Sequence, residues 1–315
     1  MNQQKILLVN IDSKIPNLAL AKIGKYYRDQ GYQVEEKEDQ DIEEVPEALM
    51  IYASCVFTEN RDKCKRWEGR AVIGGSGYDI GLKLPEEMEA IKPRINLGFT
   101  TRGCIRKCQF CIVPKKEGSI EIVGDLYDLW DGKAKMVTLL DNNILARPDH
   151  FEKICEQARE NKIKLDHNQG LDHRLLTEDI VKIMKRTSHR HYKLAFDHPD
   201  YKNSVDRAIT LLQKHGIKQS TWYVLCGYNT TFQEDLDRLN YLRDRGQAAY
   251  VQRYERLKYI IPLARWANQH HVFKKMKFEE FIMLRQDRGA NITNLNEVQW
   301  EGRNEWLKTT ASQKN

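Results

Sequence analysis

The chain has 315 residues, of which 41% are hydrophobic and 30% are charged, and its formal net charge is +6. This length allows one large domain or two, and the composition is that of a soluble globular protein. No stretch approaches the roughly 20 apolar residues that a transmembrane helix needs, and residues 1–9 read as a strand, not as a signal peptide. Seven cysteines in a chain of this length do not indicate a disulfide framework. We therefore expect a protein of the reducing cytoplasm.

The charge is unevenly distributed along the chain. Residues 1–90 contain 12 Lys and Arg against 17 Asp and Glu, whereas residues 91–249 contain 27 against 21 and residues 250–315 contain 12 against 7. The first part is therefore acidic and the rest is basic. A basic surface favours nucleic acid, a nucleotide or another anion as partner, although ordinary solvated lysines explain the same counts.

The first 80 residues alternate short apolar runs with an amphipathic stretch. Apolar residues at near-helical spacing from Leu18 to Tyr27 predict a helix, and Gly31 follows where a C-cap glycine is expected. The predicted strands are residues 5–10, 33–35, 48–53 and 70–75. Strands that alternate with helices indicate a parallel sheet, so this part is predicted to be a small Rossmann-like (doubly wound) α/β domain.

Residues 81–93, which contain Pro85 and Pro93, are a predicted linker. From Arg94 the alternation resumes at longer spacing. The predicted strands are residues 95–100, 137–141, 164–168, 192–197, 221–227 and 248–252, and the predicted helices are residues 149–161, 177–186, 203–215 and 232–245. Six successive β/α units predict a partial barrel. The expected domains are residues 1–90, 91–255 and 256–315, the last a mostly helical extension.

Three cysteines, Cys104, Cys108 and Cys111, follow the first of these strands at C-x3-C-x2-C spacing, with Phe110 before the last. A [4Fe–4S] cluster normally takes four thiolates, so three from one loop leave one iron open to a small molecule. A structural zinc is the alternative, but zinc usually takes four protein ligands in two separated pairs. The other cysteines are scattered, at Cys55, Cys64, Cys155 and Cys226. The spacing therefore favours the cluster over zinc.

The cysteine spacing, with its aromatic residue, resembles the signature of radical S-adenosylmethionine (SAM) enzymes, and the resemblance extends from Arg94 to Gly246. It implies a partial (β/α)6 TIM-type barrel in which the three cysteines hold a [4Fe–4S] cluster. The open iron of that cluster is expected to chelate the amino and carboxylate groups of SAM. Reductive cleavage of SAM would then give a 5'-deoxyadenosyl radical that abstracts hydrogen from an unidentified substrate. The implied electron donor is of the flavodoxin or ferredoxin type.

The N-terminal part weakly resembles the cobalamin-binding domain that precedes some radical SAM barrels. The likeness rests on the strand order and on the turn at Gly74 and Gly75. In those domains a D-x-H-x-x-G motif supplies the histidine that ligates cobalt, but residues 12–17 here read Asp-Ser-Lys-Ile-Pro-Asn. We therefore expect a degenerate domain that has lost cobalamin or binds it without a lower ligand, and we favour loss.

In α/β barrels the chemistry collects at the C-terminal ends of the strands, and polar residues follow each predicted strand here. The resemblance implies SAM-binding roles for residues at these ends: Phe110, Asp141, Asn143, Gln169, Arg174, Asp197 and Gly227. The family's Gly-Gly-Glu segment is absent, so Asp141 or Asn143 is expected to bind the SAM ammonium. Arg174 suits its carboxylate.

Further residues are candidates for catalysis or substrate contact: Lys115, Asn168, His173 and Cys226. For Lys115 a solvated loop position is the default. For His167 and His173 polar lining is favoured over acid–base or metal roles. For Cys226 a small buried apolar role is favoured over hydrogen donation to a radical.

A non-enzymatic alternative stays open. An iron–sulfur or zinc-bearing module would bind nucleic acid through the basic barrel and residues 255–308, where Trp266, Trp300 and Trp306 lie among basic residues. Core packing is the favoured explanation of these tryptophans.

Overall fold

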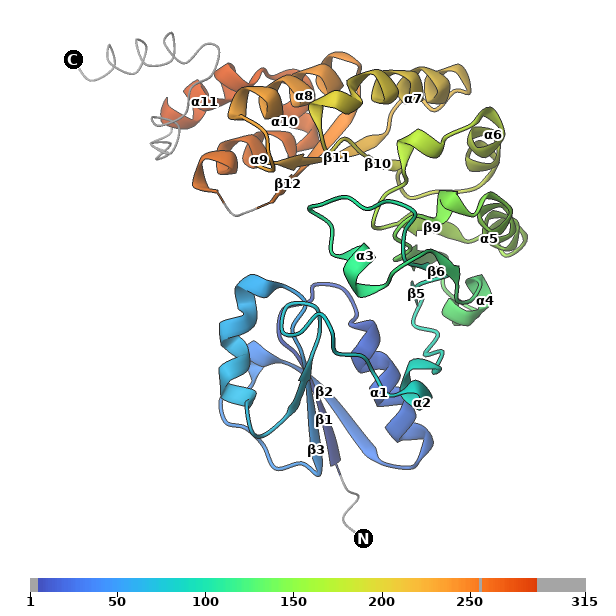
Figure 1. Ribbon diagram of the computed structural model, residues 1–315, viewed down its shortest axis with the longest axis vertical. Helices are drawn as coiled ribbons and strands as arrows, with labels where there is room; N and C mark the ends of the chain where they lie inside the picture. Colours follow the sequence, from blue (N-terminus) through green and yellow to red (C-terminus); the bar gives the residue numbers. More distant parts are fainter. Residues whose placement is uncertain (1–4, 255–256, 288–315) are drawn as a thin grey trace, which may run out of the picture.

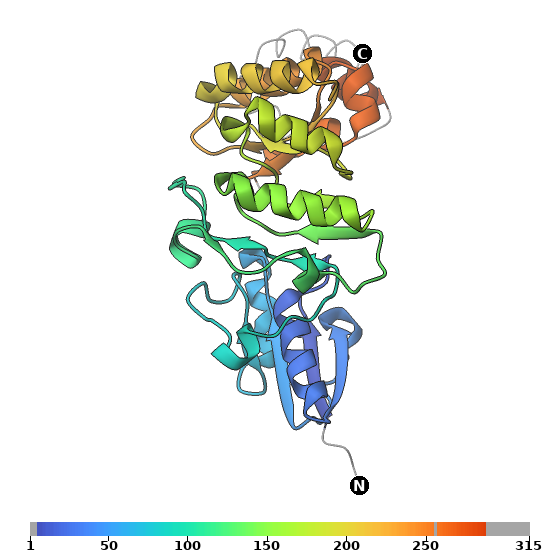
Figure 2. The ribbon, with the colours of Figure 1, turned by 90° about the vertical axis from the view of Figure 1, so that its right-hand side faces the viewer.

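The computed structural model describes residues 5–254 and 257–287, a mixed α/β chain whose sheets are mostly parallel. The elements follow the long axis of the molecule in sequence order, with the N-terminal sheet at one end and the last described helices at the other (Figures 1 and 2). Among the described residues, none of the helices is both long and apolar enough to cross a membrane.

The N-terminal sheet has four parallel strands in the order β2-β1-β3-β4. Its strands are β1 (Lys5–Asn10), β2 (Gln33–Glu38), β3 (Met50–Ser54) and β4 (Val72–Gly74), with helices α1 (Leu18–Asp29) and α2 (Glu86–Glu89) and 3-10 helices η1 (Asp39–Asp41) and η2 (Thr58–Trp67). Leu8 of β1 packs with Leu20 of α1 on one face, whereas Leu7 packs with Trp67 of η2 on the other. All four strands predicted here are confirmed, and apolar layers cover both faces of the sheet.

The remaining parallel strands form two sheets of three. The first has the order β5 (Leu97–Gly98), β8 (Met136–Leu139) and β9 (Lys164–His167), and the second has the order β10 (Lys193–Ala195), β11 (Thr221–Cys226) and β12 (Ala248–Arg253). An isolated parallel bridge between Leu171 and Leu194 connects the segment after β9 to β10. All six strands that the sequence predicted here are therefore present.

Helices follow these strands and share one core cluster with them. The predicted helices are confirmed as α5 (Pro148–Glu160), α6 (Glu178–Arg186), α7 (Lys202–Lys214) and α8 (Phe232–Asp244). Short elements that the sequence did not predict lie between β5 and α7: β6 (Thr101–Arg102), α3 (Val113–Lys116), β7 (Glu121–Ile122), α4 (Leu126–Leu129), η3 (Ile144–Ala146), η4 (His173–Leu175) and η5 (Pro199–Tyr201). β6 and β7 pair antiparallel and enclose the cysteine loop.

The described part of the C-terminal region is helical, with η6 (Lys258–Ile260), α9 (Ile261–Ala267), α10 (His270–Lys275) and α11 (Phe278–Asp287). Trp266 is fully buried, and its Nε1 donates to the main-chain oxygen of Met276 (2.9 Å). The hypothesis that Trp266 stacks on nucleic acid is therefore wrong, because a buried ring has no face to offer. Trp300 and Trp306 lie outside the described residues.

The N-terminal sheet meets the segment around the cysteine loop through polar contacts. Glu89 pairs with Lys22 of α1 (2.8 Å) and with Arg102 of β6 (3.3 Å). Lys116, at the end of α3, donates to Ser76 Oγ in the loop that follows β4 (2.5 Å). The carboxyl edge of the N-terminal sheet is thus attached to the helix that follows the cysteines.

At that edge the chain satisfies its own backbone amides. In an open α/β sheet, ligands bind where the strand order reverses, here between β1 and β3. The Asp12 carboxylate, just after β1, accepts from the main-chain N–H groups of Val56 (2.7 Å) and Phe57 (2.8 Å) and from Asn60 (3.2 Å). The amides that would hold an anionic ligand at this crevice are therefore already taken.

Candidate functional site

The cysteine loop is held at its base by the turn that closes it. Gly103 has a φ of +77°, and a Cβ there would lie 2.1 Å from the main-chain oxygen of Ser119. Glu117 accepts from the Gly103 N–H (3.1 Å) and from Asn142 Nδ2 (2.6 Å). The Cys104 N–H donates to the oxygen of Gly118 (3.2 Å). This close backbone approach explains the glycine that precedes the first cysteine.

Gly103→Ala is expected to destabilise the loop more than Gly118→Ala does. Both glycines have a positive φ, but nothing lies within 4 Å of a Cβ at Gly118. Gly118→Ala, the control, should therefore lose only the about 1–2 kcal/mol of stability that a left-handed backbone costs a non-glycine residue. In Gly103→Ala the backbone must also move away from Ser119. Thermal unfolding of both variants gives the difference. Equal melting temperatures for the two variants would contradict this account of the turn.

All three motif cysteines are free thiols, and they line one cavity of about 230 Å³. Arg106, Phe110 and Val113 of the same segment and Tyr201 of η5 add to the lining. The other lining residues belong to successive strands or follow them: Asn142 and Asn143 after β8, residues 169–174 after β9, Ala195 and Asp197 at and after β10, and Tyr223 and Gln252 of β11 and β12. The cavity therefore lies where the sequence predicted that the chemistry would collect.

Asp172 is the node of the polar network in this cavity. Its buried carboxylate accepts from Arg106 Nε (2.9 Å), from Arg174 Nε (2.7 Å) and Nη2 (3.1 Å), and from Asn143 Nδ2 (3.3 Å). The two guanidinium groups hold the pKa of Asp172 below its ordinary value, against the opposing effect of burial. Asp172 thereby fixes the cysteine loop, the β8 end and the β9 end relative to one another.

Asn143 offers an unused acceptor in the same wall. Its Nδ2 donates to Cys104 Sγ (3.4 Å) and to Asp172, but its buried Oδ1 has no hydrogen-bond partner in the described part of the chain. Buried polar atoms are almost always paired, so an unpaired acceptor in a cavity wall points to a donor on a ligand.

Burial alters the ionisation of the other groups in the wall. It raises the pKa of the Cys108 and Cys111 thiols. It also raises the pKa of Asp197 to about 6, and no hydrogen bond or ion pair from a described residue reaches that carboxylate. His173 lies at Ser204 Oγ (2.9 Å), and burial lowers its pKa to about 4. The histidine is therefore neutral near pH 7, and the thiols favour their neutral form unless a cation binds them.

The structure brings many of the predicted site residues together at the cavity. Those that line it are Cys104, Cys108, Phe110, Cys111, Asn143, Gln169, His173, Arg174 and Asp197.

The other predicted site residues do not line the cavity. Asp141 Oδ1 accepts from the main-chain and side-chain donors of Thr100 and Thr101, so this carboxylate braces the turn before the cysteine loop. Gly227 donates its N–H to Asp235 (2.9 Å). The remaining three are Lys115, exposed on α3, Asn168, whose main-chain oxygen accepts from Tyr223, and Cys226, fully buried in the core.

Sequence reasoning missed several lining residues, among them Arg106, Asp172, Tyr201, Tyr223 and Gln252. Arg106 lies inside the cysteine motif, and this position is the only feature of the sequence that could have indicated a place in the site. Its Nε binds Asp172. His167 is buried and stacks on His189 (ring centroids 5.3 Å apart) outside the cavity lining, so the interpretation of His167 as polar lining is wrong.

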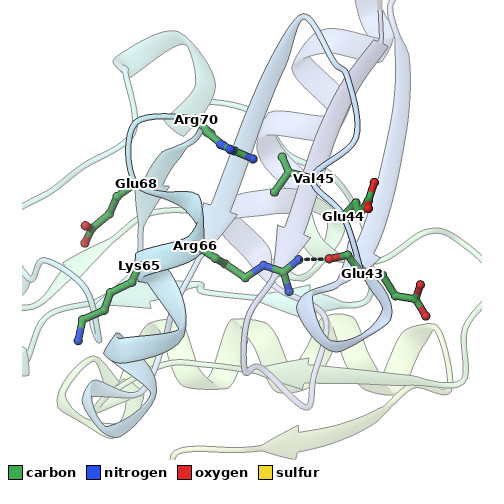
Figure 3. Close-up of a pocket in the computed structure, with 7 residues that line it drawn as sticks. All are labelled: Glu43, Glu44, Val45, Lys65, Arg66, Glu68 and Arg70. Atoms are coloured by element: carbon green, nitrogen blue, oxygen red, sulfur yellow. Dashed lines mark hydrogen bonds between the residues drawn. The ribbon is translucent and has the colours of Figure 1, made fainter.

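A broader hollow of about 690 Å³ lies in the N-terminal part (Figure 3). Its lining carries both charges: Glu43, Glu44, Val45, Lys65, Arg66, Glu68 and Arg70. Arg66 donates to the main-chain oxygens of Ile42 (2.6 Å) and Glu43 (3.1 Å). It therefore stabilises the backbone of this segment. With no thiol or histidine in this lining, the cavity at the cysteines is the candidate site.

Across the described ranges, no trio of His, Cys, Asp or Glu side chains is placed to bind one metal ion. The ligands of an iron–sulfur cluster bind different iron atoms and do not share a single ion. Three thiols around one cavity are the donor set that such a cluster takes, and a cationic cluster would relieve the cost of ionising them.

The chain matches no protein-family model and no curated protein sequence. Among solved structures it is similar to Streptococcus suis SuiB bound to S-adenosylmethionine, with 16% identity, a TM-score of 0.36, and coverage of 62% of this chain and 45% of that one. It is also similar to SuiB bound to precursor peptide SuiA, with 14% identity, a TM-score of 0.37, and coverage of 74% of this chain and 58% of that one. A third similar structure is a spore photoproduct lyase variant with bound AdoMet and dinucleoside spore photoproduct, with 9% identity, a TM-score of 0.29, and coverage of 88% of this chain and 76% of that one. The chain spans about half the length of the two SuiB chains.

Proposed function

We propose that this chain is a radical SAM enzyme. The observation that carries the proposal is the meeting of three motif thiols, Asn143 and two arginines in the wall of one cavity at the strand ends. We further propose that residues 91–255 form a partial (β/α)6 barrel around this cavity and that residues 256–315 extend it. Residues 1–90 are proposed to be a degenerate cobalamin-binding-like domain, because Asp12 occupies the amides of its crevice.

Cys104, Cys108 and Cys111 would hold the cluster. When bound, a [4Fe–4S] cluster with one open iron would supply the electron that cleaves SAM to methionine and a 5'-deoxyadenosyl radical. The chain's part is to exclude water from the half-buried thiols and to hold them in one loop, which the Gly103 turn and Glu117 anchor.

Side chains in the wall suit the parts of SAM. The unpaired Asn143 Oδ1 is an acceptor for its ammonium. The sequence suggested Arg174 for the carboxylate, but Asp172 occupies its Nε and Nη2 and only the Nε of Arg106. The two terminal nitrogens of Arg106 are therefore proposed to bind the carboxylate instead. Asp197 is an acceptor for the ribose hydroxyls, and Phe110 offers a ring to the adenine.

The radical would take a hydrogen atom from an unreactive C–H bond, giving 5'-deoxyadenosine and a substrate radical. Gln169, His173 and Gln252 line the remaining wall and are the proposed substrate contacts. The electron is proposed to come from a flavodoxin or ferredoxin-type donor.

The test is anaerobic reconstitution of the full chain with iron and sulfide, reduction with dithionite in the presence of SAM, and chromatography for 5'-deoxyadenosine. We expect 5'-deoxyadenosine to form, and SAM to be consumed, only when the cluster is reduced. A full, reducible cluster that yields no product would contradict the proposal. Zinc in place of iron in the purified protein would favour the non-enzymatic binding module.

A further inference from the structure

Two exposed tyrosines lie near the cavity, Tyr250 on strand β12 and Tyr254 directly after the last residue of that strand. Tyr250 and Gln252 are two residues apart on β12 and therefore project from the same face of the sheet. Gln252 lines the cavity, so this face is the cavity side. Tyr250 is 44% exposed and Tyr254 is 42% exposed. Large aromatic rings so exposed beside a cavity mark a surface that a ligand covers.

Further aromatic rings connect both tyrosines to the cavity wall. Tyr254 packs on Tyr228 (ring centroids 4.6 Å apart), and Tyr228 packs on Phe110 of the cysteine loop (5.3 Å). Tyr250 packs on Tyr223 (5.8 Å), which lines the cavity. We name these five residues the aromatic rim. The rim runs from the cysteine loop along the cavity side of β12.

The edge of β12 does not suit an added peptide strand. Among the described strands, β12 pairs only with β11, which leaves one edge without a strand partner. The Asn268 side chain takes the Val251 N–H (2.7 Å) and carbonyl (3.4 Å) on β12. A peptide that joined the sheet beside Gln252 would have to displace this amide.

The charges on either side of Phe110 in the sequence favour an anionic polymer. Lys107 and Lys115 flank Phe110 in sequence, are exposed, and have no carboxylate partner within the described residues. The chain as a whole carries a net charge of +6. Aromatic rings beside free cations are how single-stranded nucleic acids are bound, with bases stacked on the rings and phosphates near the cations.

We propose that the aromatic rim binds single-stranded nucleic acid, with bases stacked on Tyr250 and Tyr254, and presents one nucleotide to the cavity beside Gln252. The role of that nucleotide as the substrate rests on the proposed function, whereas the binding itself does not. The amide of Gln252 can pair with a base edge through both its donor and its acceptor.

The test is fluorescence anisotropy of a labelled oligonucleotide of about 12 nucleotides, as DNA and as RNA, titrated with the full chain. We expect affinity that falls as salt rises. Tyr250→Ala and Tyr254→Ala should each weaken binding roughly tenfold, because each removes one stacking platform, and phenylalanine at either position should restore it. Tyr127→Ala is the matched control, since Tyr127 is 41% exposed but lies on α4, outside the rim.

The proposal is overturned if neither oligonucleotide binds saturably, if Tyr127→Ala weakens binding as much as the rim variants do, or if a labelled extended peptide binds the rim instead. Formation of 5'-deoxyadenosine without oligonucleotide binding would reject this inference and keep the proposed enzyme. Oligonucleotide binding in a protein that never cleaves SAM would keep this inference and reject the proposed enzyme.

Discussion

Cys108→Ala is expected to abolish formation of 5'-deoxyadenosine and to lower the iron content of the reconstituted protein. Cys108 lies in the middle of the motif and lines the cavity, and a [4Fe–4S] cluster with only two thiolates from the chain is poorly held. The expected loss is complete within detection, because the electron that cleaves SAM has no other source in the proposed mechanism. Iron and sulfide analysis, the absorbance of the cluster and product chromatography measure it.

Cys155→Ala is the matched control for this prediction. Cys155 is also a free thiol, but it is fully buried in α5 within the core cluster and does not line the cavity. Its replacement should cost on the order of 1 kcal/mol of stability through the small cavity that it leaves, and iron content and product formation should persist. A Cys108→Ala protein that keeps its full iron and its activity would show that the motif does not hold the cluster.

The strands could be predicted because each is a short apolar run bounded by turn residues. The apolar run at β11 and the alternating pattern at β12 predicted strands, and both form strands that pair in parallel. The β6–β7 hairpin could not be predicted, because strands of two residues have no periodicity to detect. This hairpin encloses the cysteine loop, so sequence reasoning found the cysteines but not the frame that presents them.

The site could be predicted to the level of residue type and strand end, but not of side-chain direction. Asp141 and Asn143 both follow β8, yet Asp141 turns to the amides of the preceding turn while Asn143 reaches the cavity. The central position of Asp172 in the polar network could not be predicted, because its partner Arg106 is 66 residues away in sequence. Only tertiary structure brings a cysteine-loop arginine to the end of β9.

Asp197→Asn is expected to stabilise the folded protein above about pH 6 and to weaken SAM binding. Burial raises the pKa of Asp197 from its ordinary value of 3.8 to about 6, and the nearby Asp172 carboxylate adds to this effect, while Arg238 and Arg174 oppose it. The fold therefore favours the neutral carboxyl. Its contribution to stability is fully present below the ordinary value and is lost as pH rises through about 6.

The measured quantity is the difference in unfolding free energy between Asp197→Asn and wild type. Raising the pKa of this carboxyl from 3.8 to about 6 corresponds to at most about 3 kcal/mol of unfolding free energy. Water in the cavity should reduce the gain near neutral pH to about 1–2 kcal/mol. Denaturant unfolding at about pH 5 and about pH 7.5 should show the gain mainly at the higher pH. Asp179 lies on α6 with its side chain 87% exposed, so Asp179→Asn should show no such change.

If Asp197→Asn changed the free energy of unfolding equally at both pH values, ionising the buried carboxyl would not destabilise the fold. No functional reason would then be needed to keep an aspartate at this position. A gain in stability together with weaker SAM binding is the pattern expected of a side chain that is kept for its ligand.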